Sequence, residues 1–231
     1  IQFILEDSQA QALVVDAAWF AKVESILPNT HIRHVLLSGG DNATGTVAEA
    51  VAQGNRLPPA PTVQEDALPA VIMYTSGTTG DPKGAVLTHQ NILFGAIHSL
   101  LGYGVDRSYK SLIVAPLFHI GALAASVTPI VYAGGSLIIS SFYNASETLK
   151  TICREKINYM FAVPLMYQMM ADVPEWRTAD LSHVHFFISG GAPIPLPVIR
   201  KYQDEKGIGF VQGYALTETG RLTSLDLEDS I

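Results

Sequence analysis

The residues best suited to chemistry lie in one short stretch of glycines and hydroxyl side chains with a single lysine. It runs Tyr74-Thr75-Ser76-Gly77-Thr78-Thr79-Gly80-Asp81-Pro82-Lys83-Gly84, directly after an apolar run at residues 70–73. Glycine lets backbone N–H groups come close to a ligand, and successive N–H groups in a turn form a concave anion site. The hydroxyls and the lysine add donors. The stretch therefore predicts a phosphate-binding loop, formed by Thr75, Ser76, Gly77, Thr78, Thr79, Gly80 and Lys83.

Two other interpretations of this stretch have to be weighed. Segments rich in Gly, Ser and Thr between strands are commonly plain connecting loops. The common mononucleotide loop, G-x-x-x-x-G-K-[ST], is disfavoured because Pro82 stands five positions after Gly77 and Gly84 follows Lys83, where Ser or Thr is required.

Three further motifs follow along the chain. They are Pro116 to Ala122 around His119, Ser189 to Ile194, and Gly213 to Gly220. Taken singly, each has an ordinary structural explanation: a core histidine, a glycine turn before a helix, and a solvated glutamate. The second motif follows an apolar run, and ligands of open α/β sheets bind at the carboxyl ends of strands.

The order and sequence of these motifs resemble those of the adenylate-forming superfamily, and residues 74–84 resemble its phosphate loop along their whole length. That superfamily comprises acyl- and aryl-CoA synthetases, adenylation domains of nonribosomal peptide synthetases, and beetle luciferases. The resemblance implies that the loop holds the β and γ phosphates of ATP. It implies that Thr217 donates to a phosphate, that Glu218 holds Mg²⁺ and that Tyr214 packs on adenine. It also assigns nucleotide contacts to Gly190, Gly191, Ala192, Pro193 and Gly213.

By the same resemblance, His119 lies at the mouth of the acyl pocket, where it gates the approach of the carboxylate to ATP. Members that activate amino acids usually carry an Asp at this motif, which pairs with the substrate ammonium. This sequence has His119 and no Asp nearby. Because a buried ammonium needs a partner, an acid without an α-amino group fits better.

The resemblance thus implies an ATP-dependent acyl-CoA synthetase, in which Glu218, Thr217 and His119 are the catalytic residues. A fatty or aryl acid and ATP form an acyl-adenylate and pyrophosphate, and CoA then displaces AMP. Two alternatives remain: an adenylation domain directed to amino acids or to an acyl-carrier protein, and a non-catalytic nucleotide-binding fragment. Family members continue with a C-terminal lid domain that carries a catalytic lysine, so we expect a partial catalytic domain that is inactive in isolation.

Composition excludes several classes of protein. Hydrophobic residues make up 48% of the 231 residues and charged residues 15%, so a sizeable core is expected. The net charge of −7 argues against a nucleic-acid partner. No apolar run reaches the roughly 18 residues of a membrane span. The single cysteine, Cys153, is expected to be structural, and its lack of a cysteine partner fits a cytoplasmic protein.

Apolar runs alternate with helical patterns, which predicts an α/β fold. We expect layered, mostly parallel sheets with flanking helices, incomplete in this chain. Thr88 is a good N-cap for a helix over 89–101, and Gly207 a good end for one over 198–206. The proline-rich residues 54–69 suggest a linker between an N-terminal segment, 1–69, and an AMP-binding core, 70–231. Further predictions are strands at 13–15, 32–37, 85–87, 111–115, 157–163, 185–188 and 209–212, and helices at 17–27, 46–53, 146–156 and 164–170.

Overall fold

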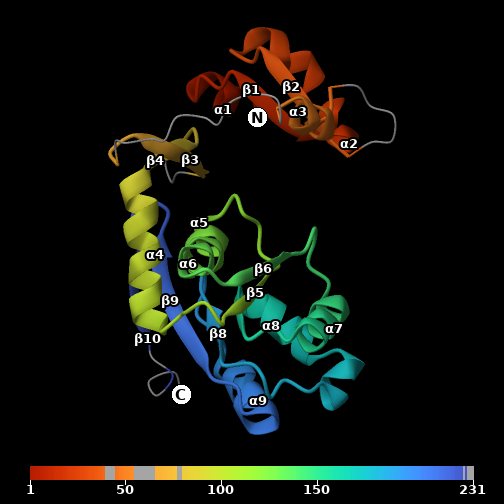
Figure 1. Ribbon diagram of the computed structural model, residues 1–231, viewed down its shortest axis with the longest axis vertical. Coiled ribbons are helices and arrows are strands. Elements are labelled where there is room, and N and C mark those ends of the chain that lie inside the picture. Colours follow the sequence, from red (N-terminus) through yellow and green to blue (C-terminus); the bar gives the residue numbers. More distant parts are fainter. Residues whose placement is uncertain (40–44, 55–65, 77–79, 226, 228–231) are drawn as a thin grey trace. The chain divides into compact units, whose positions relative to one another are not determined.

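The computed structural model describes residues 1–39, 45–54, 66–76, 80–225 and 227. The chain forms two compact units. One comprises Ile1–Glu65 with Tyr74–Gly84, and the other comprises Asp66–Met73 with Ala85–Ile231 (Figure 1). The second unit contains the larger sheet and both buried cores.

The first unit is built on two parallel strands, β1 and β2, with Val14 opposite Leu36. Both strands agree with the apolar runs predicted there. The predicted helix at 46–53 is confirmed as well. In chain order the elements are α1 (Gln2–Asp7), β1 (Ala12–Asp16), α2 (Ala17–Phe20), the 3-10 helix η1 (Glu24–Asn29), β2 (His34–Ser38) and α3 (Val47–Gly54).

The single helix predicted for residues 17–27 is wrong. Only Ala17–Phe20 is α-helical, and Glu24–Asn29 is a 3-10 helix that contains Pro28. The amides of Lys22 and Val23 donate three residues back, to Trp19 and Phe20, instead of four. Proline cannot donate and disfavours the α conformation of the preceding residue, so the regular helix does not continue towards it.

Strands β3 (Pro69–Thr75) and β4 (Lys83–Thr88) form a two-stranded sheet on either side of the predicted phosphate loop. Helix α4 (His89–Tyr103) begins directly after β4. The hydroxyl of Thr88 accepts from the amide of Asn91, whose side chain bonds back to the Thr88 amide. This reciprocal cap satisfies two N–H groups that a helix start leaves unpaired, which confirms the predicted N-cap.

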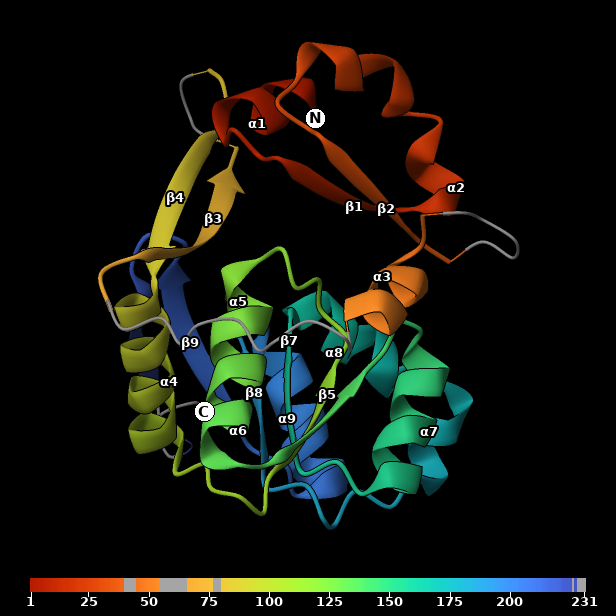
Figure 2. The same cartoon turned by 45° about the horizontal axis from the view of Figure 1, so that its top comes forward.

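A six-stranded sheet is the centre of the second unit, in the order β10-β9-β8-β7-β5-β6 (Figure 2). All neighbouring pairs are parallel except β9 with β10. Its strands are β5 (Lys110–Ile113), β6 (Ser136–Ile139), β7 (Tyr159–Ala162), β8 (Phe186–Ser189), β9 (Phe210–Leu216) and β10 (Gly220–Leu225). Besides α4, the described helices of the second unit are α5 (Ile120–Ala122), the π-helix η2 (Leu123–Val127), α6 (Thr128–Ala133), α7 (Ala145–Glu155), α8 (Pro164–Ala171), the 3-10 helix η3 (Pro174–Thr178) and α9 (Leu196–Lys206). The predicted α/β class is confirmed.

Alternate residues of the buried strands face opposite sides of the sheet, because side chains along a strand alternate with a period of two. Met160 and Phe187 belong to a core with residues of α7, α8 and α9. Their neighbours Tyr159 and Phe186 belong to a second core with residues of α4, α5 and α6. Helices therefore cover both faces, as expected for strands that are apolar throughout.

Tyr167 of α8 joins the two central strands from one of these faces. Its side chain is fully buried, and its hydroxyl lies 2.9 Å from the carbonyl oxygens of both Met160 in β7 and Ile188 in β8. Removing the hydroxyl takes one donor away from two buried carbonyl oxygens. We expect Tyr167→Phe to lower the free energy of unfolding by about 1–3 kcal/mol, measured by urea denaturation. The matched control is Tyr132→Phe on exposed α6 surface, and equal midpoints for the two variants would contradict the assignment.

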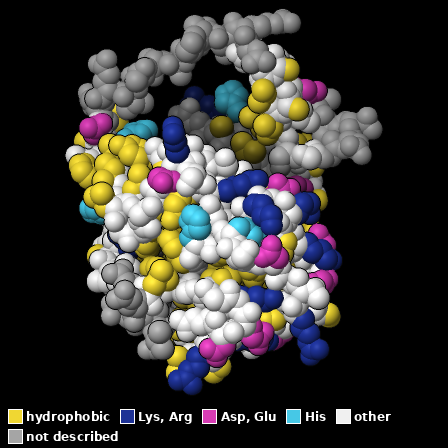
Figure 3. All heavy atoms as spheres, turned by 60° about the horizontal axis from the view of Figure 1, so that its bottom comes forward, with side chains coloured by type: hydrophobic (Ala, Val, Ile, Leu, Met, Phe, Trp, Pro, Cys, Tyr) yellow, Lys and Arg dark blue, Asp and Glu magenta, His cyan; other side chains and the backbone are white. Residues whose placement is uncertain are grey.

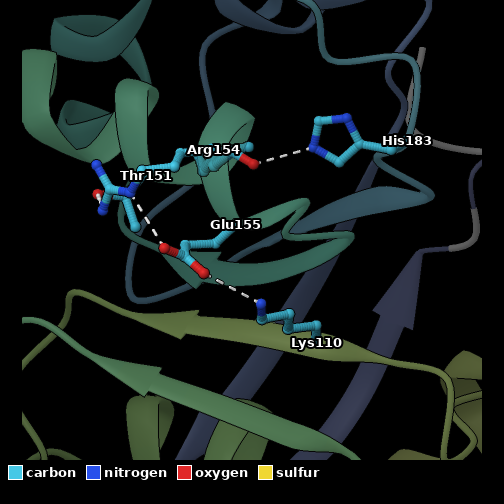
Figure 4. A network of polar contacts seen from close by, with 6 residues as sticks. Lys110, Thr151, Arg154, Glu155 and His183 are labelled. Carbon is cyan, nitrogen blue, oxygen red and sulfur yellow. Dashed lines mark hydrogen bonds and ion pairs between the residues drawn. The ribbon is translucent and has the colours of Figure 1, made fainter.

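Polar contacts fasten the end of α7 to the start of β5 and to the segment before β8 (Figure 4). Lys110 lies 3.3 Å from Glu155, which also pairs with Arg154. The ring of His183 bonds to the carbonyl oxygen of Ile152. Hydrogen bonds from Arg154 and then from Lys110, with smaller contributions from the two positive charges, lower the pKa of the Glu155 carboxyl. Cys153 in the same helix is a half-buried free thiol, as expected.

Glu175 of η3 makes the free energy of unfolding depend on pH in the acid range. Hydrogen bonds from Ser146, from its own backbone and from Lys150 lower its pKa to about 2. Because this pKa is below the unfolded value of 4.5, the stabilisation is complete above pH 4.5 and is lost as the pH falls towards 2. Glu175→Gln is therefore expected to flatten the fall of stability across this window. Denaturation midpoints at pH 7 and pH 3 measure it, with Asp204→Asn as the surface control. A variant that keeps the parental pH dependence would contradict the expectation.

The described surface mixes charges of both signs. On the face drawn in Figure 3, basic and acidic side chains are interspersed over the second unit. Among the described helices, none combines the length and hydropathy needed to cross a membrane.

Candidate functional site

The glycines after β8 let the backbone pass close to its neighbours. A Cβ on Gly190 would lie 3.1 Å from the Phe161 ring and 3.2 Å from the carbonyl oxygen of Gly213. Gly191 has φ +81°, a conformation that disfavours other residues. Ala192 and Pro193 follow on the exposed surface. This turn therefore requires glycine at its first two positions for steric reasons.

Gln212 holds this turn in place and was not singled out by sequence reasoning. Its side-chain oxygen accepts from the backbone N–H of Ile194 over 2.7 Å. The contact joins β9 to the segment after β8, eighteen positions away. A polar residue directly after the buried pair Phe210-Val211 was the available signal. Gln212 is thus a positioning residue for the glycine turn.

The motif Gly213 to Gly220 forms a β-hairpin. The strand predicted at 209–212 was too short, because β9 continues to Leu216 and pairs with β10. Pairing with β10, the next strand of the hairpin, supplies the hydrogen bonds that extend it. Tyr214 is 57% exposed in β9. Thr217 is half-buried and Glu218 exposed in the turn between the strands.

His119 lies where the chain leaves β5 and enters α5, as predicted for a strand-to-helix junction. It is the N-cap residue of α5. Its exposed ring lies 4.7 Å, centre to centre, from the ring of Phe118. The imidazole is therefore not a buried core histidine.

Two adjoining cavities lie among these elements of the second unit. The first has a volume of about 280 Å³ and the second about 180 Å³. His119, Gly190, Gly191 and Gly213 line the first, and Glu218 lines the second. The first is completed by Ser99, Tyr103, Ala115, Pro116, Ile120, Gly121, Ala122, Ala124, Ala125, Phe161, Val163, Ile188, Ala215, Gly220 and Arg221.

The same four residues, Ile120, Ala124, Gly220 and Arg221, line both cavities. The structure therefore brings three of the predicted motifs to one continuous region of the second unit. Ala192, Pro193, Tyr214 and Thr217 flank this region in sequence but do not line either cavity. No described methionine lines the first cavity, and Met160 and Met170 are buried in the core on the opposite face of the sheet.

The predicted phosphate loop belongs to the first compact unit. Gly77, Thr78 and Thr79 lie outside the described residues. The hydroxyl of Thr75 donates to the carbonyl oxygen of Lys83 over 3.4 Å, and Gly80 has φ +137°. Ser76 and the Lys83 side chain are exposed. The positive φ of Gly80 is a conformation that favours glycine at this position.

Glu218 is an exposed carboxylate that can serve as a single protein ligand of a metal ion. Among the described residues it forms no ion pair, and no group of three metal-binding side chains occurs there. Mg²⁺ is usually held by one or two carboxylates with phosphate oxygens and water, not by a cage of protein ligands. A single free carboxylate beside a cavity fits that requirement.

Comparisons with known proteins agree on one family. A family model described as AMP-binding enzyme matches residues 1–230. Feruloyl-CoA synthase of Amycolatopsis sp is 40% identical over 148 residues, 64% of this chain and 30% of that protein. Long-chain-fatty-acid–CoA ligase FadD13 of Mycobacterium tuberculosis is 39% identical over 166 residues, 69% of this chain and 32% of that protein. The chain thus spans about a third of the length of these curated relatives.

A solved structure covers nearly the whole fold. The inhibitor-bound N-terminal domain of FACL13 from Mycobacterium tuberculosis superposes with a TM-score of 0.85 at 31% identity. The superposition includes 99% of this chain and 56% of that one.

Proposed function

Because the chain belongs to the family of AMP-binding enzymes, we propose that its intact protein is an ATP-dependent acyl-CoA synthetase. A carboxylic acid and ATP give an acyl-adenylate and pyrophosphate, and the thiol of CoA then gives the thioester and AMP. The observation that carries the proposal is the pair of adjoining cavities, one lined by His119 and Gly190 and the other by Glu218. An acid and a nucleotide phosphate have to meet at such a place.

The reaction needs alignment more than a protein nucleophile. A carboxylate oxygen of the acid attacks the α-phosphorus, and the bond from that phosphorus to the bridging oxygen of pyrophosphate breaks. In the second step the CoA sulfur attacks the acyl carbonyl carbon and AMP leaves. Holding both reactants in line and stabilising charge at phosphorus provide the acceleration. His119 borders the first cavity, where we propose that it orients the acid.

We propose that the remaining motif residues bind the nucleotide. Gly190, Gly191, Ala192, Pro193, Gly213 and Tyr214 bind the adenylate portion, and Thr217 donates to a phosphate. Thr75, Ser76, Gly77, Thr78, Thr79, Gly80 and Lys83 hold the β and γ phosphates. Glu218 holds Mg²⁺, which neutralises phosphate charge when bound. In this proposal residues 70–231 form the AMP-binding core and 1–69 an N-terminal segment.

The first cavity favours an acid without an α-amino group. Among its described lining residues there is no Asp or Glu to pair with a buried ammonium. Its volume of about 280 Å³ lies near the lower end of common ligand pockets, about 300–1,000 Å³. Aryl and short fatty acids are therefore the substrates that we propose. A cytoplasmic location, where ATP and CoA are available, is part of the proposal.

ATP–pyrophosphate exchange by the full-length enzyme tests the proposal, with a panel of aryl, fatty and amino acids, followed by a thioester assay with CoA. We expect exchange with aryl or fatty acids and CoA-dependent thioester. Exchange with amino acids alone would instead indicate an amino-acid adenylation domain. Exchange without transfer to CoA would indicate a carrier-protein acceptor. Nucleotide binding without any exchange would overturn the enzymatic assignment.

A further inference from the structure

The ring of Phe161 is packed between two glycines in the wall of the first cavity. Phe161 lies near the end of β7, and Gly121 and Gly190 line the same cavity. A Cβ on Gly121 would lie 2.8 Å from Cζ of the ring, and a Cβ on Gly190 would lie 3.1 Å from Cε2. Non-bonded carbon atoms prefer a separation of about 3.5–4.0 Å. The tip of the ring therefore fits at this place only because both neighbours lack a side chain.

These contacts place Phe161 between two of the motifs that the sequence singles out. Gly121 is in α5, two residues after His119, whereas Gly190 opens the turn after β8. In the sheet β7 lies between β5 and β8, and Phe161 is paired with Ile188 of β8, which also lines the cavity. The width of the cavity beside these two motifs therefore depends on the side chain at position 161.

Phe161 is the largest side chain without a polar atom among the described residues that line this cavity. More than half of those residues are Gly or Ala, so the ring is a large part of the apolar wall. Truncating it would remove apolar volume and leave no polar group unpaired. Because a packed core relaxes only partly around a truncated side chain, part of the vacated space stays open. That space adjoins the cavity, since the ring itself lines it.

We propose that Phe161 determines how large an acid the first cavity accepts, because its ring occupies the space that a longer acid needs. The substrate class is aryl acids and short fatty acids, and the ring excludes longer fatty acids. The inference rests on the proposed synthetase function, because it assumes that the first cavity receives the acid. Phe161 takes part in no chemical step and acts only on the size of the acid that binds.

Straight-chain fatty acids from butanoate to decanoate test this size limit. The kcat/KM of ATP–pyrophosphate exchange is measured for each acid with the full-length enzyme and with its Phe161→Leu and Phe161→Ala variants. We expect the parent to prefer butanoate to decanoate. Phe161→Ala should raise the ratio of decanoate to butanoate by roughly 10- to 100-fold, the effect of about one methylene group in an apolar pocket. Phe161→Leu should shift the ratio less, in the same direction.

Phe187 of β8 provides the matched control, because it is a buried phenylalanine on the opposite face of the sheet and does not line the cavity. Phe187→Leu should lower the melting temperature and leave the ratio of the two acids unchanged. A parent that prefers decanoate, or an unchanged ratio in both Phe161 variants, overturns the proposal. A loss of kcat/KM that is equal for all acids would show that Phe161 is structural only, and would overturn it as well.

Gly121→Ala tests the packing of the ring without any enzyme assay. In the parent the new methyl group meets the tip of the ring, so this variant should melt below the parent. Leucine does not reach as far as a phenyl ring, so Gly121→Ala should cost less in the Phe161→Leu background. Residues in contact give such non-additive effects, whereas effects at independent sites add. Equal losses of melting temperature in both backgrounds would overturn the proposal, because the ring would then not lie against Gly121.

Calorimetric binding of butanoate and decanoate to the full-length protein separates the size limit from the proposed function. If no aryl or fatty acid supports exchange but Phe161→Ala still shifts the ratio of the two Kd values towards decanoate, the synthetase assignment fails and the size limit stands. If exchange occurs and neither ratio depends on position 161, the size limit fails and the synthetase assignment stands. A full-length protein that binds and activates no acid overturns both.

Discussion

Replacing Glu218 with alanine is expected to slow acyl-adenylate formation in the full-length enzyme by on the order of 10²-fold or more. Glu218 is an exposed carboxylate in the β9–β10 turn, lines the second cavity and has no ion-pair partner among the described residues. If it holds Mg²⁺ against the phosphates, its loss removes charge stabilisation that is needed in the transition state. Losing one well-placed stabilising group commonly costs about 10²–10³-fold in kcat.

ATP–pyrophosphate exchange at saturating acid measures this effect, with the Mg²⁺ concentration varied. Glu218→Gln keeps the size but not the charge, so it should be nearly as slow as Glu218→Ala. Thr223→Ala, at an exposed position of β10 that lines neither cavity, is the matched control and should retain activity. Exchange at the parental rate in Glu218→Ala would remove this residue from the mechanism.

Replacing Gly213 with valine is expected to reduce kcat/KM for bulky acids by roughly 10- to 100-fold. A Cβ on Gly213 meets only the Tyr103 hydroxyl, at 3.5 Å, which is ordinary contact distance, and the residue lines the first cavity. The added side chain can therefore occupy ligand space without straining the fold. Each added methylene-sized group in an apolar pocket changes discrimination by about 10–200-fold.

The loss of kcat/KM is expected to depend on the size of the acid and of the new side chain, so smaller acids and a smaller substitution serve as controls. Gly213→Ala should have a smaller effect than Gly213→Val, and short acids should lose less activity than ring-bearing ones. The melting temperature should stay close to that of the parent. Unchanged kcat/KM for ring-bearing acids in Gly213→Val would show that the acid lies elsewhere. A variant that melts far below the parent would show that the position is structural.

Several elements followed from local sequence because their determinants are local. Thr88 and Asn91 form the start of α4 within four residues, and Gly207 ends α9 with φ +68°. The alternation of apolar runs and helical patterns predicted the α/β class, which the six-stranded sheet confirms. The candidate site residues remain predictions, although His119, Gly190, Gly191 and Gly213 line one cavity.

Two element boundaries were missed. The helix predicted at 17–27 is interrupted before Pro28 by i→i−3 hydrogen bonds, and β9 extends beyond Gln212 because it pairs with β10 in a hairpin. Gln212 and Arg221 carry no motif of their own. Each is held by a backbone group that the fold brings close: Gln212 accepts from the amide of Ile194, and Arg221 donates to the carbonyl oxygen of His98.

The sequence by itself determined the residue types that can hold phosphate, metal and carboxylate, and the order of strands and helices that carry them. Only the tertiary structure decided which of them border the same cavity and that Arg221 borders it as well. The physical reason is the distance along the chain over which each kind of interaction acts. Caps, turns and periodicity act within a few residues, whereas a cavity and its charge balance depend on contacts between segments about a hundred residues apart, as between His98 and Arg221.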